Sequence, residues 1–226
     1  MKKFMAAAAA FVISAAMLTS FTSCSEEEKT SSASGNALVQ DNMGKDVNIK
    51  ENDLPFGATT TDLYTDTDNV PVSITYDNRF MTEEQARKIS DYIYAVNTKD
   101  EALLTEAGYK PYIELIMSDY DCTSVKEYLD SRYDAIKAAA GGDFQFQFII
   151  PGEFYSESDD ESITGFNALD AKIKQASPDA EITERYMIKT EITFTVDGQS
   201  GEYSLSSRTG DTVLYIYRID GQIYIL

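Results

Sequence analysis

The chain has 226 residues, with 38 acidic and 19 basic side chains and no histidine. Without histidine it forms neither a Ser-His-Asp triad nor a Cys-His pair, and it offers no histidine ligand to zinc. The acidic balance argues against a nucleic-acid partner and against adhesion of the folded body to anionic lipid, because both need clusters of Lys and Arg.

The first residues have the pattern of a secretory signal peptide. Lys2 and Lys3 form a short positive segment, and an uncharged apolar run extends from Phe4 to Leu18. That run is shorter than the about 20 residues that a membrane-spanning helix needs. Small polar residues and Cys24 come next. The pattern therefore predicts export followed by cleavage near this point.

The segment Phe21-Thr22-Ser23-Cys24 resembles the lipobox of bacterial lipoproteins. In that family the cysteine at the cleavage site is acylated and becomes the new N-terminus. Ser23 fits the small residue that the motif requires, whereas Phe21 departs from the usual leucine, and plain secretion is the alternative. The resemblance implies a signal peptide over residues 1–23, lipidation of Cys24 and an extracytoplasmic protein anchored to the cell membrane through that lipid.

Cleavage before Cys24 leaves 17 basic against 38 acidic residues. Cys122 then has no disulfide partner, and we expect it to behave as a small buried apolar residue. Residues 24–52 are polar and lack a sustained apolar period, which predicts a flexible tether. Residues 53–226 are numerous enough to form a single domain with its own core.

Helical patterns dominate the first half of this domain, after one short strand. That strand is expected at Val70–Tyr76, where Pro71 favours an edge or a strand start. Thr82 and Gln85 have capping-box spacing, and the helix that they open presents one apolar face as far as Val96.

Two further helical stretches follow. One begins at Glu101 and is disturbed at Gly108 and Pro111. The next begins at the cap residue Ser124 and ends at the glycine pair 141–142.

Strands dominate the remainder. Strict alternation predicts a strand at Phe144–Phe148, and after an acidic loop a short helix is expected over Phe166–Ile173. Apolar residues at even positions predict a long, bent strand over Ile182–Val196. A returning strand is expected at Glu202–Thr209 and a central one at Val213–Tyr217.

The chain closes with a hairpin. Asp220-Gly221 is a strong two-residue turn signal, and Gln222–Leu226 follows as the last strand. Helices followed by an antiparallel meander predict an α+β fold.

The stretch from Tyr92 to Leu103, YIYAVNTKDEAL, resembles the helix-turn-helix opening of the NTF2-like (cystatin-like cone) superfamily. The order of elements over about Thr82 to Leu226 is also similar. The strand near Val72 and the long helical region at 110–140 depart from the family core. The resemblance implies N-terminal helices packed on a curved antiparallel sheet, with a pocket between the sheet and the first helices.

Enzymes of that superfamily often use an aspartate and tyrosines in this pocket. Six tyrosines are candidates to face it, but no motif assigns any of them a catalytic role: Tyr92, Tyr94, Tyr112, Tyr186, Tyr215 and Tyr217. Packing in the core or at the rim is the simpler interpretation of each.

No cofactor or metal site is predicted. The chain has no phosphate-binding loop and no dinucleotide-binding glycine motif. The acidic segments at 66–69 and 158–161 are the densest carboxylate clusters, but they lack the glycine and distant glutamate of a helix-loop-helix calcium loop.

Two functions are favoured, and a purely structural or homo-oligomeric role is the remaining alternative. The first is a non-enzymatic binding or accessory module whose ligand is an unidentified protein or small molecule. The second is an isomerase- or dehydratase-like enzyme that uses a buried carboxylate and tyrosines, because burial can raise the pKa of a carboxylate enough for it to act as a general base without histidine.

Overall fold

The computed structural model describes residues 36–40, 46–50, 64–66, 70–156, 160–210 and 212–226, and their side chains over 70–156, 162–210 and 212–226. Strands β1 (Asn36–Gln40) and β2 (Asp46–Lys50) form an antiparallel hairpin within the predicted tether. Cys24 lies outside the described residues, so cleavage and lipidation there stay predictions.

The body is a mixed α+β fold, as the sequence predicted, built on one curved sheet. The strand order is β3-β4-β5-β6-β8-β9. Strands β5 to β9 pair antiparallel, whereas β4 pairs parallel with β5. The strands are β3 (Tyr64–Asp66), β4 (Ser73–Asp77), β5 (Phe144–Ser156), β6 (Ile182–Val196), β7 (Tyr203–Ser204, paired with β6), β8 (Thr212–Ile219) and β9 (Gln222–Ile225).

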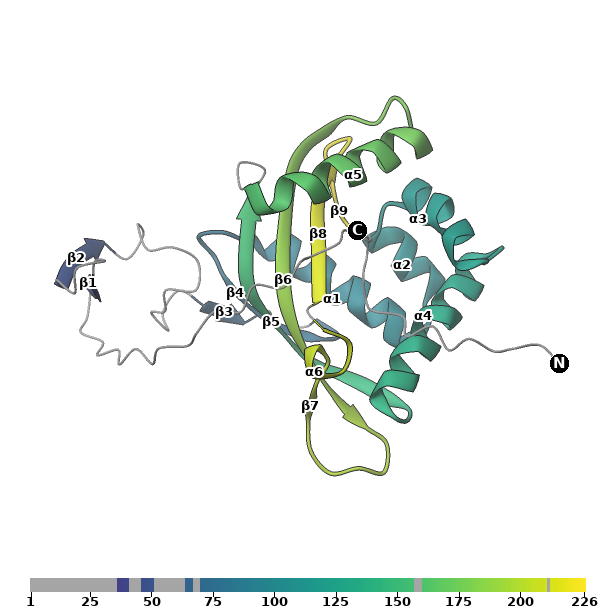
Figure 1. The fold of residues 1–226 in the computed structure, drawn as a ribbon, viewed down its shortest axis with the longest axis horizontal. Coiled ribbons are helices and arrows are strands. Elements are labelled where there is room, and N and C mark those ends of the chain that lie inside the picture. The colour runs from purple at the N-terminus through teal and green to yellow at the C-terminus, as the bar shows by residue number, and fades with distance from the viewer. Residues whose placement is uncertain (1–35, 41–45, 51–63, 67–69, 157–159, 211) are drawn as a thin grey trace.

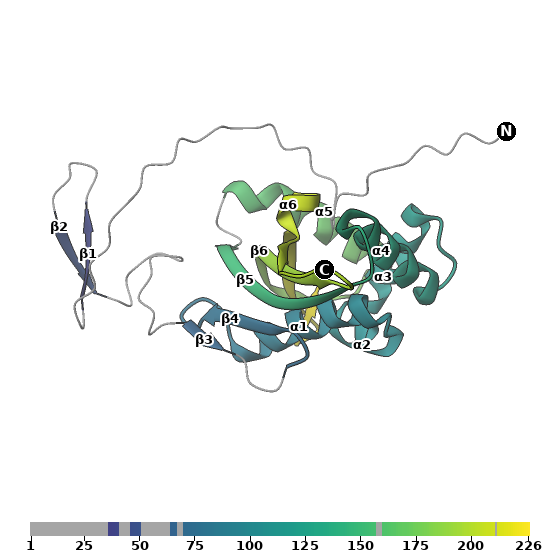
Figure 2. The same ribbon diagram turned by 90° about the horizontal axis from the view of Figure 1, so that it is seen from below.

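The helices lie on both sides of this sheet (Figure 2). Helices α1 and α2 lie on one side, and α5 and α6 lie on the other. The helices are α1 (Glu83–Thr98), α2 (Glu101–Ala107), α3 (Lys110–Ile116), the 3₁₀ turn η3 (Met117–Tyr120), α4 (Val125–Ala140), α5 (Asp160–Ala176) and α6 (Ser206–Thr209).

The predicted helix ends agree with the structure. Thr82 and Gln85 form the reciprocal capping box at the start of α1. Gly141 ends α4 with φ 86°, the left-handed conformation that glycine adopts without steric cost. Lys110 and Pro111 begin α3 after the break at Gly108. The turn at Asp220-Gly221 also has positive φ at both residues, as a type I′ hairpin requires.

Two predicted elements were wrong in extent. Helix α5 begins at Asp160 rather than near Phe166, because acidic residues that suit a loop also stabilise a helix N-terminus. The expected strand over Glu202–Thr209 is reduced to the two residues of β7 and is followed by α6. There Ser207 donates its backbone N–H to the Ser204 hydroxyl, and such serine bonds favour a turn over a strand.

The sheet curves around α1. This helix contacts both β4 and β9, near the two ends of the sheet, as well as β5 between them. At the C-terminal end of α1, the Asn97 amide donates to the carbonyl oxygen of Phe144 and accepts from the N–H of Phe146. These bonds fix the helix against the start of β5. Within the described residues, no helix is long and apolar enough to cross a membrane.

Candidate functional site

The two faces of the sheet differ in chemistry. Along β6 the even-numbered side chains from Ile188 to Val196 are buried, whereas the odd-numbered ones from Lys189 to Thr195 are partly exposed. Successive side chains of a strand point to opposite faces. The even residues therefore face the apolar core with α1, and the odd residues face the side of α5 and α6.

The core side is filled. Buried isoleucine and phenylalanine side chains from α1, β5, β6 and β8 form one cluster there, which includes Ile89, Ile93, Phe146, Ile149, Ile188, Ile192, Phe194 and Ile216. These side chains are buried between the sheet and α1.

The six candidate tyrosines do not share one pocket. Tyr92 and Tyr112 are buried among the helices, whereas Tyr94 is half-buried on α1. Tyr186 packs its ring against Phe154 with centroids 5.0 Å apart. Tyr215 and Tyr217 are buried beneath α5, where both rings contact Phe166.

Tyr92 belongs to a buried group of tyrosines around Arg132. Burial raises the pKa of Tyr92 to about 12, and burial likewise raises the pKa of Tyr112 and of Tyr128. Arg132 donates from Nη1 to the Tyr120 hydroxyl oxygen at 3.3 Å. These tyrosines stay neutral over the physiological pH range, so they act as packing groups and hydrogen-bond partners.

A carboxylate does meet a tyrosine hydroxyl under α5. Tyr217 donates to Asp170 Oδ1 at 3.0 Å, and Arg185 donates to the other oxygen, Oδ2. Burial first, and the charge of Asp170 second, raise the pKa of Tyr217. Asp170 and Arg185 keep 25% and 29% of their side-chain surface exposed. Asp170 is therefore held as an ion pair at the edge of the core.

A pocket of about 520 Å³ opens beside this ion pair. It is lined by Asp170, Ala171, Lys174, Glu181, Ile182 and Arg185. Lys174 is already bonded to the carbonyl oxygen of Ala180 at 2.6 Å. The pocket thus contains charges of both signs, and most of these charged groups already form ion pairs or hydrogen bonds within the protein.

A second pocket lies on the exposed face of the sheet, and we call it the polar pocket. It has a volume of about 260 Å³ and is lined by Gly152, Glu153, Lys189, Thr190, Glu191 and Ser206. Glu153 accepts from Lys189 at 2.6 Å and from the Tyr155 hydroxyl at 2.5 Å. These two bonds lower the pKa of the Glu153 carboxyl.

Glu191 has a different environment from Glu153. Its Oε2 accepts from the Ser206 hydroxyl, whereas its Oε1 is buried and has no hydrogen-bond partner among the described residues. No lysine or arginine in the described ranges forms an ion pair with Glu191. No motif in the sequence distinguishes these residues, although charged side chains at odd positions of a long strand indicate an exposed sheet face.

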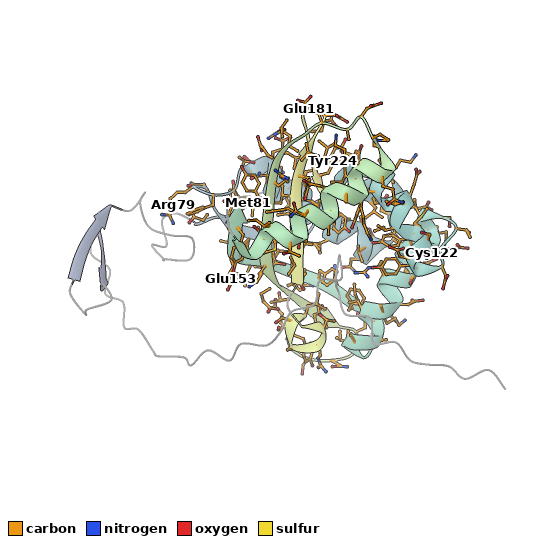
Figure 3. All side chains as sticks on the ribbon, turned by 45° about the horizontal axis from the view of Figure 1, so that its top comes forward. Arg79, Met81, Cys122, Glu153, Glu181 and Tyr224 are labelled. Atoms are coloured by element: carbon orange, nitrogen blue, oxygen red, sulfur yellow. The ribbon has the colours of Figure 1, made fainter. Side chains whose placement is uncertain are left out.

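No metal site is evident in the part of the chain that has described side chains, where no three Cys, Asp or Glu residues converge. The side chains of the acidic segments at 66–69 and 158–161 fall outside it. Cys122 is half-buried, and burial raises the pKa of its thiol. Cys122 and Glu153 lie at opposite sides of the body (Figure 3).

Comparisons with protein-family models, with curated proteins and with solved structures found no match to this chain.

Proposed function

We propose that this protein is a lipid-anchored, extracytoplasmic binding or accessory module with no enzymatic activity of its own. Its body would be an NTF2-like cone, held to the cell membrane through acyl chains on Cys24 and a polar tether. Two acyl chains suffice for stable anchoring. The acidic surface of the body keeps it away from anionic headgroups.

The observation that carries the binding function is the contrast between the two sheet faces. The side that would hold a catalytic pocket in a cone enzyme is packed with buried isoleucine and phenylalanine. The opposite side has a pocket lined by charged and hydroxyl side chains. An arrangement with a filled interior and an open polar surface supports recognition at the surface rather than chemistry inside the cone.

The enzymatic alternative is favoured by the contact between Tyr217 and Asp170. A general base must be available to take a proton from a substrate. Asp170 instead accepts from Arg185 and Tyr217 at once, which favours a structural role. Because this role is structural, Asp170→Asn should lower the melting temperature of the protein without the loss of an enzymatic activity.

A thermal-shift screen of the full chain against small charged and neutral metabolites tests the proposal. A ligand that binds the native state raises the melting temperature in a saturable way. We expect at least one such compound, recovered chemically unchanged after incubation. Conversion of a compound by the protein, with loss of that conversion in Asp170→Asn, would establish the enzyme instead.

A further inference from the structure

The pocket beside the Asp170–Arg185 ion pair, which we call the α5–β6 pocket, is separate from the polar pocket. The two share no lining residue, and Glu181 lies away from Glu153 in the body (Figure 3). Two charges of the α5–β6 pocket cancel, because Asp170 and Arg185 pair with each other. The charges of Lys174 and Glu181 remain, so these two side chains decide which ligand the pocket favours.

Lys174 carries a positive charge that the protein does not balance. Its ammonium group donates to the carbonyl oxygens of Ala180 at 2.6 Å and of Pro178 at 3.5 Å, and both acceptors are uncharged. Among the described residues no carboxylate forms an ion pair with Lys174. An ammonium group has three N–H donors. One donor therefore remains for a ligand, and an anionic ligand would balance the charge.

Glu181 supplies a negative charge at the same pocket. Its backbone is fixed by Asp220, whose Oδ1 accepts from the Glu181 N–H at 2.8 Å and whose own N–H donates to the Glu181 carbonyl oxygen at 2.9 Å. The side chain of Glu181 is exposed, and within the described ranges it has no hydrogen bond or ion pair. Its carboxylate is therefore accessible to a ligand that supplies a cation.

The two charged groups are close enough for one small molecule to contact both. Lys174 Nζ lies 2.6 Å from the oxygen of Ala180, and standard peptide dimensions place the Cα of Glu181 about 2.8 Å from that oxygen. The ammonium nitrogen is thus within about 5.5 Å of this Cα. In an α-amino acid the carboxylate and the ammonium are about 3 Å apart, and each hydrogen bond to the protein adds about 2.8 Å. Such a molecule can therefore reach from Lys174 to Glu181.

We infer that the α5–β6 pocket binds a free α-amino acid with an aliphatic side chain, its carboxylate on Lys174 and its ammonium on Glu181. This ligand class rests on the proposed binding function and makes it specific. Ala171 is exposed and Ile182 is half-buried, and both line the pocket. Burial of an alkyl chain against them adds to the affinity. The volume of about 520 Å³ is in the usual range for small-molecule sites.

Titration of the ¹⁵N-labelled full chain with L-leucine at constant ionic strength, followed by NMR, tests this inference. We expect saturable one-to-one binding with a dissociation constant of about 1 mM or below. 4-Methylpentanoate lacks the ammonium and 3-methylbutylamine lacks the carboxylate, and each should bind at least about tenfold more weakly. Equal binding of either analogue would overturn the inference, because a single charge would then account for the affinity.

Variants identify the contacts. Glu181→Gln keeps the shape of the side chain and should weaken leucine binding at least about tenfold, while the affinity for 4-methylpentanoate stays within about twofold. Lys174→Gln should weaken leucine binding and spare 3-methylbutylamine. Asp179→Asn is the matched control, since Asp179 is exposed nearby but does not line the pocket, and its affinity for leucine should stay within about twofold. Unchanged leucine affinity in Glu181→Gln would contradict the site.

Glycine and the thermal-shift screen supply the remaining outcomes. Glycine lacks the alkyl chain and should bind at least about threefold more weakly than leucine, and equal binding would contradict the contact with Ile182. If leucine does not bind while the thermal-shift screen still finds another saturable ligand, this inference fails and the binding function stands. If Lys174 and Glu181 pair with each other in solution, no amino acid will bind, and the inference fails in the same way.

Discussion

Ser90 is fully buried on α1, and its hydroxyl makes two hydrogen bonds with the backbone of Val72. It accepts from the N–H of Val72 at 3.0 Å and donates to the carbonyl oxygen at 2.6 Å. Val72 lies directly before β4, so one side chain satisfies two buried backbone groups and fixes the helix to the start of the strand. Groups of this kind rarely remain without partners in native proteins.

Ser90→Ala should destabilise the protein by about 1–3 kcal/mol, because it leaves the N–H and carbonyl group of Val72 buried without partners. Urea denaturation followed by circular dichroism measures the loss. Ser118→Ala removes an exposed hydroxyl that bonds to the carbonyl oxygen of Leu115, and it should change the free energy of unfolding by less than about 0.5 kcal/mol. Equal effects of the two substitutions would refute the role of Ser90.

Residues with local partners were predictable, and residues with distant partners were not. Thr82 caps α1 through Gln85, three residues away in sequence, so spacing alone identified it. The role of Ser90 depends on Val72, which lies 18 residues earlier and directly before β4. Glu191 accepts a hydrogen bond from Ser206, 15 residues later, and this contact does not follow from the pattern around position 191. The polar pocket therefore emerged only from the fold.

At the scale of elements, α5 is the helix that covers the outer face of the sheet (Figure 1). Gly165 faces the ring of Tyr215 on β8, and a Cβ atom at this glycine would overlap the Tyr215 hydroxyl and lie 3.1 Å from Cζ. The helix can approach the strand closely because it has no side chain at this position. Arg185 and Asp170 then join α5 to β6.

Gly165→Ala should destabilise the protein by about 1–3 kcal/mol through overpacking, although alanine is favoured over glycine within a helix by about 1 kcal/mol. Combining it with Tyr215→Phe should recover part of the loss, since the overlapping hydroxyl is then absent. A double-mutant cycle of unfolding free energies measures this coupling. Strictly additive effects would show that the two residues do not meet.

Element types were more predictable than their extents. The period of β6 identified a long strand that must bend, and the structure has register shifts on both of its sides. The ends of α5 and β7 were misjudged because serine and acidic residues favour several local conformations, and tertiary contacts select among them. Leu205 makes one such contact, because its side chain is completely buried in the core.

Across the whole molecule, a group of buried tyrosines stabilises the fold only while they are neutral. Tyr92, Tyr112 and Tyr128 lie among the helices, and Tyr217 lies under α5. Burial raises the pKa of each above the usual value of 10.0. An unfolded chain would ionise them near that value, whereas the folded chain holds them protonated.

Stability should therefore be fully present below pH 10 and fall as the pH rises from about 10 to about 12, the raised pKa of Tyr92. Tyr92 alone should account for about 2–3 kcal/mol over this range. Denaturation midpoints measured against pH, together with tyrosinate absorbance, test this. Tyr92→Phe should flatten the alkaline decline. An unaltered profile in Tyr92→Phe would contradict the linkage.

The remaining whole-molecule claim is that this acidic body is held outside the cell by lipid on Cys24. The intact mass of the native protein, purified from the membrane fraction of the cells that make it, tests that claim most directly. The account predicts a chain that begins at Cys24 and carries acyl groups, and a Cys24→Ala variant that leaves the membrane fraction. A chain that begins at Met1 without acyl groups, found in the cytosol, would contradict it.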